Sequence, residues 1–228
     1  MKSLKSTLIL AALAFFSTMS QAANIDVELD LTKRGEPIHP YVYGQFIEHL
    51  GRCIYGGIWA EMLEDRKFYF PVTADYDPYQ ALEDSPLPVV GASPWEILGA
   101  VGGVQMVRED SFVGEHTPRI SAGSGIRHRD LALEKGKGYT GYIWLKNDSF
   151  STSEVKVTLS ARLEDGKEQS MTYAISGDSY VKKAFSFDGL ADTATATLSI
   201  EVLKGDAYVG TLSLMPADNI KGMRPDTL

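Results

Sequence analysis

A carboxylate, an imidazole and a guanidinium lie close together near the start of the chain. Glu48 and His49 end a short apolar run, and Arg52 follows three residues later. The pair Gly56–Gly57 then suits a tight turn, and glycines let the backbone and a ligand approach closely. Charged side chains at the end of a strand, next to such a turn, are typical of a polar binding site on a rigid scaffold.

Two short runs carry a family resemblance. They are Phe46–Arg52, which reads FIEHLGR, and Ile54–Ile58, which reads IYGGI. Together they resemble the signature of glycoside hydrolase family 51 α-L-arabinofuranosidases, enzymes that remove arabinofuranose from plant polysaccharides. The resemblance implies a retaining glycosidase acting on terminal non-reducing α-L-arabinofuranosyl residues. Its partner would be an arabinose-containing polysaccharide or oligosaccharide of the arabinoxylan or arabinan type.

The resemblance also assigns roles to the charged residues. It places Glu48 in the sugar subsite, where an ionised carboxylate accepts hydrogen bonds from arabinose hydroxyls. The alternative for Glu48 is a structural ion pair with Arg52. His49 and Arg52 are expected to support the subsite from behind or to pack, without touching the sugar.

No catalytic residue is expected within this chain. Retaining glycosidases need two carboxyl groups about 5–5.5 Å apart. The resemblance implies a pair of glutamates at the ends of barrel strands beyond residue 228. Glu61 and Glu64 are three residues apart on a predicted helix, and we interpret them as a solvated face or as ion pairs with Arg66 and Lys67.

Residues 1–22 have the features of a signal peptide. Lys2 and Lys5 precede the apolar run Leu8–Phe16, and Ser20–Ala22 supplies the small residues of a cleavage site. Nine apolar residues are too few to span about 30 Å of hydrocarbon, so no membrane partner is expected. The sequence predicts export to the periplasm or the extracellular space after cleavage near Ala22.

Charge and cysteine content exclude several classes of function. The net charge is −8 and the basic residues are scattered, which argues against a nucleic-acid partner. Arg127–Arg129 and Lys182–Lys183 are interpreted as solvated surface. Cys53 is the sole cysteine, so an intramolecular disulfide is excluded. The four histidines are dispersed, and neither a cofactor nor a set of metal ligands is assigned.

Residues 95–216 are predicted to form a β-sandwich. Apolar and polar residues alternate over 155–163 and 194–202, as in half-buried strands. Evenly spaced short strands with polar turns between them indicate an antiparallel sandwich of the jelly-roll type. Further strands are predicted at 139–145, 171–175, 180–187 and 208–214.

The flanking segments are predicted to belong to another domain. The resemblance implies a catalytic (β/α)8 barrel, and a complete barrel needs about 250 residues. The expected fold is therefore mainly β, with the sandwich inserted after the first strand of a truncated barrel. Strands are predicted at 25–31 and 41–47, and helical turns at 59–66. The predicted segments are 23–70 for the N-terminal strands, 71–94 for a proline-rich linker and 217–228 for the start of a barrel helix.

Four aromatic residues of the sandwich have two possible roles. Trp95, Tyr139, Tyr142 and Trp144 either form a stacking platform for sugar rings or fill the core, and the apolar character of both faces of 139–145 favours the core. The sandwich also resembles the galactose-binding-like modules inserted in such enzymes. Many of these hold a structural calcium, although no acidic cluster here identifies its ligands.

Two further classes of protein remain open at this stage. One is a non-catalytic, exported carbohydrate-binding protein, and the other is a surface adhesion module that recognises protein. The reading frame downstream of Leu228 separates them from the enzyme. Continuation into further barrel strands with two glutamates at strand ends would favour the glycosidase.

Overall fold

The structure is a computed structural model, and it covers two separate compact units, Met1–Phe46 and Ile47–Leu228. In the first unit, the Val42 amide donates a hydrogen bond to the His39 carbonyl oxygen (2.9 Å), and Val42 lies in a helical turn. The rest of the strands predicted at 25–31 and 41–47 lies outside the described residues. The described residues are 32, 35–37, 39, 42, 61–78, 91–148, 152–162 and 166–225.

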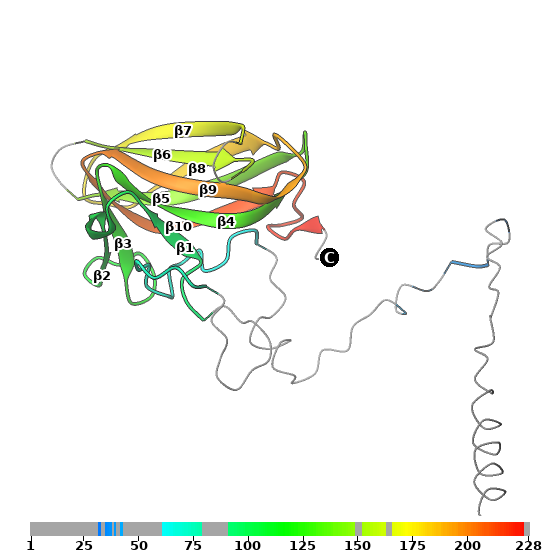
Figure 1. Ribbon diagram of the computed structural model, residues 1–228, viewed down its shortest axis with the longest axis horizontal. Coiled ribbons are helices and arrows are strands. Elements are labelled where there is room, and N and C mark those ends of the chain that lie inside the picture. The colour runs from blue at the N-terminus through cyan, green and yellow to red at the C-terminus, as the bar shows by residue number, and fades with distance from the viewer. Residues whose placement is uncertain are drawn as a thin grey trace, which may run out of the picture. The chain divides into compact units, whose positions relative to one another are not determined.

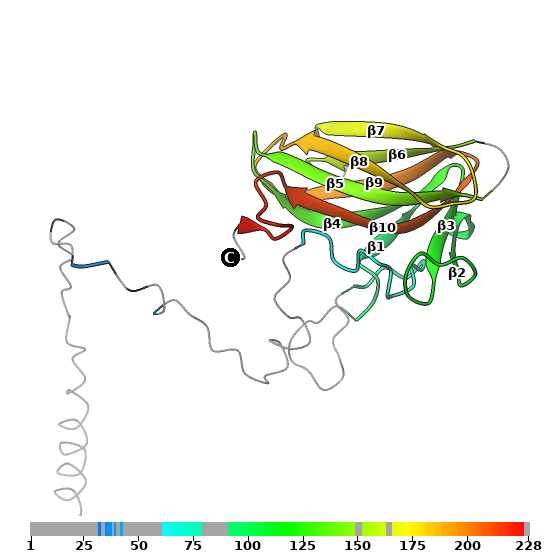
Figure 2. The same ribbon diagram turned by 180° about the vertical axis from the view of Figure 1, so that it is seen from behind.

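Within the described part of the second unit, ten strands form two antiparallel five-stranded sheets that pack face to face (Figures 1 and 2). The first sheet has the order β1-β4-β9-β6-β7 and the second β2-β3-β10-β5-β8. The mainly β, antiparallel sandwich predicted from the sequence is confirmed. The strands are β1 (Trp95–Leu98), β2 (Val104–Val107), β3 (Thr117–Ser121), β4 (Ser124–Leu133), β5 (Gly138–Asn147), β6 (Ser153–Ser160), β7 (Glu168–Ile175), β8 (Val181–Asp188), β9 (Thr193–Lys204) and β10 (Asp206–Pro216).

The connectivity is that of a jelly roll. Strand β3 pairs with β10, β4 with β9, β5 with β8 and β6 with β7, so that each pair is nested inside the previous one along the chain. A short 3-10 helix, Val101–Gly103, connects β1 to β2. The nesting brings residues far apart in sequence together, because the first and last of these strands are neighbours.

The core lies between the two sheets. In β6 and β9 the apolar members of the predicted alternation are buried except Ala194, and most of their polar neighbours are more exposed. This is the period of two that the sequence showed. The buried members are Val155, Val157, Leu159, Ala196, Leu198, Ile200 and Val202.

Residues 61–72, here called the closing segment, cover a free edge of β10. Strand β10 pairs with β3 over only its first three residues. Further along β10, the Met62 amide donates to the Leu214 carbonyl oxygen (3.4 Å), and the Leu212 amide donates to the Arg66 carbonyl oxygen (3.3 Å). The closing segment therefore takes the place of a neighbouring strand and protects this edge from other pairings. Figures 1 and 2 show it running beside β10 and β1.

The closing segment also supplies part of the core. Leu63 and Phe68 are 0% and 1% exposed, and Val72 is buried too. The Phe68 ring lies 5.5 Å from the ring of Trp95, which in turn meets His128 edge-on at 5.2 Å. Burying a side chain of this size stabilises a fold by about 1.5–3 kcal/mol. These rings fill the end of the sandwich that the two sheets leave open.

Two sequence-based expectations change here. The helix predicted over 59–66 is wrong for 61–66, which form bends and turns, and Asp65 and Phe68 have positive φ angles of 43° and 58°. The described sandwich also begins before residue 95, because the closing segment shares its core. At the other end, residues 217–225 form turns closed by a bridge between Ile220 and Met223. The helix start predicted beyond Pro225 lies outside the described residues.

Asp65 organises the turn inside the closing segment. Its carboxylate accepts hydrogen bonds from the amides of Tyr69 (2.6 Å) and Phe70 (3.0 Å). Its carbonyl oxygen accepts from the Phe68 amide (3.0 Å) and from the Trp95 indole (3.2 Å). Burial raises the pKa of Asp65 to about 6, although the two amide hydrogen bonds to its carboxylate oppose this shift.

His128 is held as a neutral imidazole beside the same turn. Its Nε2 accepts a hydrogen bond from the Glu64 amide (3.2 Å), so Nδ1 carries the proton and donates to the Arg129 carbonyl oxygen (2.9 Å). Burial lowers the pKa of His128 to about 4. The interpretation of this residue as solvated surface is therefore wrong.

Phe68→Ala in the complete chain is expected to lower the free energy of unfolding by about 3–5 kcal/mol, because it empties the end of the core. Tyr69→Ala is the matched control. Its side chain is 79% exposed, so the expected change stays within about 0.5 kcal/mol. Urea denaturation followed by tryptophan fluorescence measures both. Equal, small effects of the two substitutions would show that the closing segment does not belong to the core.

Asp65→Asn is expected to make the protein more sensitive to acid. Asp65, with a raised folded pKa, adds stability at low pH that is lost as pH rises through about 6. His128, with a lowered folded pKa, adds stability at neutral pH that is lost as pH falls from 6.5 towards 4. Between pH 4 and 6 the contributions of Asp65 and His128 to the pH dependence of stability have opposite signs. The Asp65→Asn substitution removes only the contribution of Asp65.

The free energy of unfolding of Asp65→Asn should therefore fall more steeply than that of the unmodified protein from pH 6.5 to 4, by up to about 1.4 kcal/mol per pH unit. Urea denaturation at several pH values gives the slopes. His128→Gln keeps an acceptor for the Glu64 amide and should give a shallower slope than the unmodified protein. Parallel curves for all three proteins would contradict the assignment of these two titrations.

Candidate functional site

The residues predicted from the signature motif lie outside the described part of the chain. These are Glu48, expected to contact the sugar, and His49 and Arg52, expected to support it. Their roles stay predictions. The described residues on either side of them are Val42 and Glu61, where the closing segment begins.

The four aromatic residues of the sandwich do not form an open platform. Trp95 and Tyr139 are 1% and 2% exposed, so the core interpretation holds for them. Tyr142 and Trp144 lie on the outer face of β5 and are half-buried. The Arg66 guanidinium donates to the Tyr142 hydroxyl (3.1 Å), and the ring of Phe112 packs 5.1 Å from that of Trp144.

Glu61 and Glu64 do not form the solvated, ion-paired face predicted for them. The Glu61 carboxylate accepts hydrogen bonds from the Ser213 hydroxyl (2.6 Å) and the Leu214 amide (3.0 Å) of β10. One carboxylate oxygen of Glu64 is buried without a hydrogen-bond partner among the described residues, and burial raises the pKa of Glu64. Both carboxylates thus face the sandwich, and Glu61 joins the closing segment to β10.

The most spacious of the described pockets lies between the closing segment and the loop that connects β2 to β3. Its volume is about 470 Å³, within the range of roughly 300–1,000 Å³ in which small-molecule sites fall. We call it the Tyr69 cavity. It is lined by Lys67, Phe68, Tyr69, Phe70, Val113, Gly114, Glu115 and His116.

The first wall of the Tyr69 cavity is rigidly built. Phe68 is anchored in the core, and the Asp65 carboxylate holds the amides of the next two residues. This arrangement turns Tyr69 outward, where 79% of it is exposed, and its ring meets that of Phe70 edge-on at 5.1 Å. An exposed aromatic ring thus stands on a fixed backbone at the cavity.

The second wall is held against the outer face of the second sheet. The Phe112 ring packs against Trp144 at 5.1 Å and against Tyr180 at 4.9 Å. Gly210 makes this position possible, because a Cβ there would lie 2.6 Å from Phe112 Cγ. The Ser111 hydroxyl donates to the Gly114 carbonyl oxygen (3.0 Å) and tightens the loop. Both walls are therefore fixed by packing against the sandwich.

Polar groups at the Tyr69 cavity come from both walls. Lys67 brings an ammonium group and Glu115 a carboxylate that is 79% exposed and 3.7 Å from Arg108. The Nε2 atom of His116 is buried and has no hydrogen-bond partner among the described residues. Among the described residues that line the cavity, Glu115 is the one carboxylate, and they contain no pair of carboxyl groups like that of a glycosidase centre.

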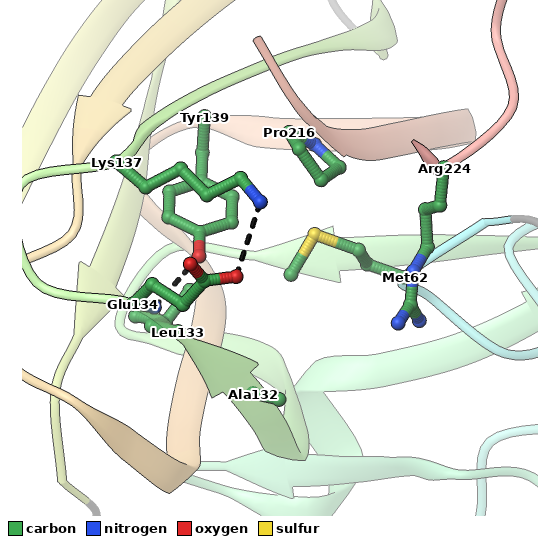
Figure 3. A pocket seen from close by; sticks show the side chains of 8 residues that line it. All are labelled: Met62, Ala132, Leu133, Glu134, Lys137, Tyr139, Pro216 and Arg224. Atoms are coloured by element: carbon green, nitrogen blue, oxygen red, sulfur yellow. Dashed lines mark hydrogen bonds and ion pairs between the residues drawn. The ribbon is translucent and has the colours of Figure 1, made fainter. Parts of the chain in front are cut away.

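A smaller pocket of about 150 Å³ lies where the chain enters and leaves the sandwich (Figure 3). Met62 and Arg224 line it from one side, and Glu134, Lys137 and Tyr139 from the other. The Lys137 ammonium is 3.0 Å from the Glu134 carboxylate. This ion pair joins the two charged groups on that side of the pocket, and the pocket has less than half the volume of the Tyr69 cavity.

The arginines of 127–129 are paired, which corrects their interpretation as solvated surface. Both Arg127 and Arg129 donate to the carboxylate of Glu96. Burial alone would raise the pKa of Glu96, but hydrogen bonds from the two guanidinium groups hold it below its usual value. This cluster fixes β1 against β4, and its charges are not free to bind a ligand.

The described residues contain no group of three or more His, Cys, Asp or Glu side chains that could hold a metal ion. The structural calcium expected in the sandwich stays a prediction. In the same part of the chain, no helix has the length and apolar character needed to cross a membrane.

Comparisons with known proteins point to arabinofuranosidases. An intracellular exo-α-L-arabinofuranosidase of Bacteroides ovatus is 42% identical over 91 residues, covering 39% of this chain and 16% of that protein. α-L-Arabinofuranosidase 1 of Arabidopsis thaliana is 22% identical over 210 residues, covering 82% of this chain and 28% of that protein. The chain thus spans less than a third of the length of either relative. No protein-family model matches it.

Among solved structures, similarity is weaker. The CBM22-1 xylan-binding domain from Paenibacillus barcinonensis Xyn10C matches with a TM-score of 0.44 and 15% identity, covering 55% of this chain and 87% of that one. A CBM4 structure matches with a TM-score of 0.42 and 16% identity, covering 55% and 90%. These scores are too low to support a conclusion about function.

Proposed function

We propose that this chain is the N-terminal part of an exported glycoside hydrolase of the α-L-arabinofuranosidase type. The whole protein would remove terminal non-reducing α-L-arabinofuranosyl residues from arabinoxylan- or arabinan-type polysaccharides. The observation that carries the proposal is the similarity to the Arabidopsis thaliana enzyme, which extends over 82% of this chain. The matched part of the chain is longer than residues 61–225. It therefore includes sequence that flanks the sandwich as well as the sandwich itself.

The arrangement of the described carboxylates supports placing the catalytic carboxyl pair in another domain of the proposed enzyme. Glu61 has a structural role, because its carboxylate is bonded to β10. Glu115 lines the Tyr69 cavity without a second carboxylate among the described lining residues. Retaining hydrolysis needs a nucleophile and an acid/base about 5–5.5 Å apart. We assign that pair to a barrel domain encoded downstream of Leu228, with Glu48 contributing to the sugar subsite.

The 228-residue chain by itself is expected not to hydrolyse 4-nitrophenyl α-L-arabinofuranoside, whereas the product of the extended reading frame should hydrolyse it. Release of 4-nitrophenol under identical conditions compares the two proteins. Turnover by the short chain above a buffer blank would refute the assignment of the chemistry to the downstream domain. An inactive extended protein that still binds arabinan would instead favour a non-catalytic carbohydrate-binding protein.

In the extended protein, Glu48→Gln should lower kcat/KM by roughly tenfold to a hundredfold without lowering Tm. The substitution keeps the shape of the side chain but removes charge-assisted hydrogen bonds to sugar hydroxyls, worth about 1.5–3 kcal/mol each. Steady-state kinetics and a thermal melt distinguish the two roles of Glu48. Unchanged kinetics combined with a lower Tm would assign Glu48 to a structural ion pair with Arg52.

A further inference from the structure

The exposure of Tyr69 has no explanation within the described fold. Its neighbour Phe68 fills the core, yet Tyr69 keeps 79% of its surface in solvent. The Asp65 carboxylate, itself largely buried, holds the Tyr69 amide in place. The turn therefore fixes an aromatic face at the edge of a cavity, and fixing it in advance lowers the entropy cost of binding a ligand.

The polar groups around this ring suit hydroxyl groups. A carboxylate accepts hydrogen bonds, an ammonium group donates them, and an imidazole nitrogen can do either. Glu115, Lys67 and His116 supply these three groups at the Tyr69 cavity. Lys67 and Glu115 bring one charge of each sign, so the site does not favour a charged ligand.

The Glu115 carboxylate is available to a ligand. Its pairing with Arg108 is long (3.7 Å), and both side chains are more than three-quarters exposed. Such surface pairs contribute at most about 1 kcal/mol, so a ligand hydroxyl competes with the pair easily. His116 Nε2 is buried and lacks a partner among the described residues, and buried polar groups are ordinarily hydrogen-bonded.

We propose that the Tyr69 cavity binds a neutral pentose residue of a polysaccharide, with the C–H face of the sugar stacked on Tyr69 and its hydroxyls bonded to Glu115 and His116. The inference rests on the proposed function for the identity of the sugar. It assigns a sugar site to the residues of the closing segment and of the loop between β2 and β3. The site would hold the substrate polysaccharide without cleaving it.

Isothermal titration calorimetry on the complete 228-residue chain tests the site with three probes. These are an α-1,5-linked arabinotriose, a β-1,4-linked xylotriose and a trigalacturonic acid. We expect at least one of the two pentose oligosaccharides to bind with a Kd of about 0.1–1 mM. Trigalacturonic acid should bind at least tenfold more weakly, because the cavity has no excess of positive charge.

Two variants of one residue separate stacking from folding. Tyr69→Ala should weaken binding about tenfold or more, whereas Tyr69→Phe should stay within about threefold, because the ring face is retained. Leu203→Ala, at an exposed position of β9 in the other sheet, is the matched surface control and should bind like the unmodified chain. His116→Ala should weaken binding without abolishing it.

Unchanged affinity in Tyr69→Ala, or no binding of any probe up to 10 mM (~10-fold above the expected range), would overturn this site. Neither result would affect the proposed function, which depends on hydrolysis by the extended protein. Conversely, binding that requires Tyr69 in a protein whose extended form is inactive would uphold the site and refute the glycosidase. Stronger binding of trigalacturonic acid than of both pentose probes would contradict the neutral ligand.

Discussion

The fold of the described unit depends on how one end of the sandwich is closed. Two five-stranded sheets leave the last layer of core open, and Phe68 fills it by packing on Trp95. The position of Phe68 depends on Asp65, whose carbonyl oxygen accepts from both the Phe68 amide and the Trp95 indole. The same residue, through its carboxylate, directs Tyr69 away from the core. Closure of the core and exposure of the ring thus have a single cause.

This arrangement places a carboxylate where burial disfavours its charge. The raised pKa of Asp65 and the lowered pKa of His128 are two results of the same burial, which favours the neutral form of each group. Acid protonates Asp65 in the folded protein before it protonates His128, so the buried turn carries no net positive charge until the pH is near 4. The titration of Asp65 therefore offsets part of the stability that is lost as His128 becomes protonated between pH 6.5 and 4.

The strands of the sandwich were predictable where polar and apolar residues alternate, because that pattern is local. β6 and β9 follow it over most of their length, with Ala194 exposed and Thr158 and Thr197 buried as exceptions. The closing segment was not predictable, since Glu61 and Arg66 find their partners on β10, roughly 150 residues further along the chain. Read locally, its spacing resembles a helix. The Tyr69 cavity was missed for the same reason, because its two walls come from segments that only the fold brings together.

The closing segment also limits where the signature motif can lie. Glu61 is bonded to β10, and Glu48 precedes it by thirteen residues. A fully extended chain spans at most about 3.6 Å per residue, so thirteen residues form a link of at most roughly 47 Å. In the proposed enzyme, the subsite around Glu48 and the Tyr69 cavity are therefore tethered to the same few residues. In that proposed enzyme, a polysaccharide held at the cavity would have side chains at a raised local concentration near Glu48, and the apparent affinity would increase more for polymer than for a single sugar.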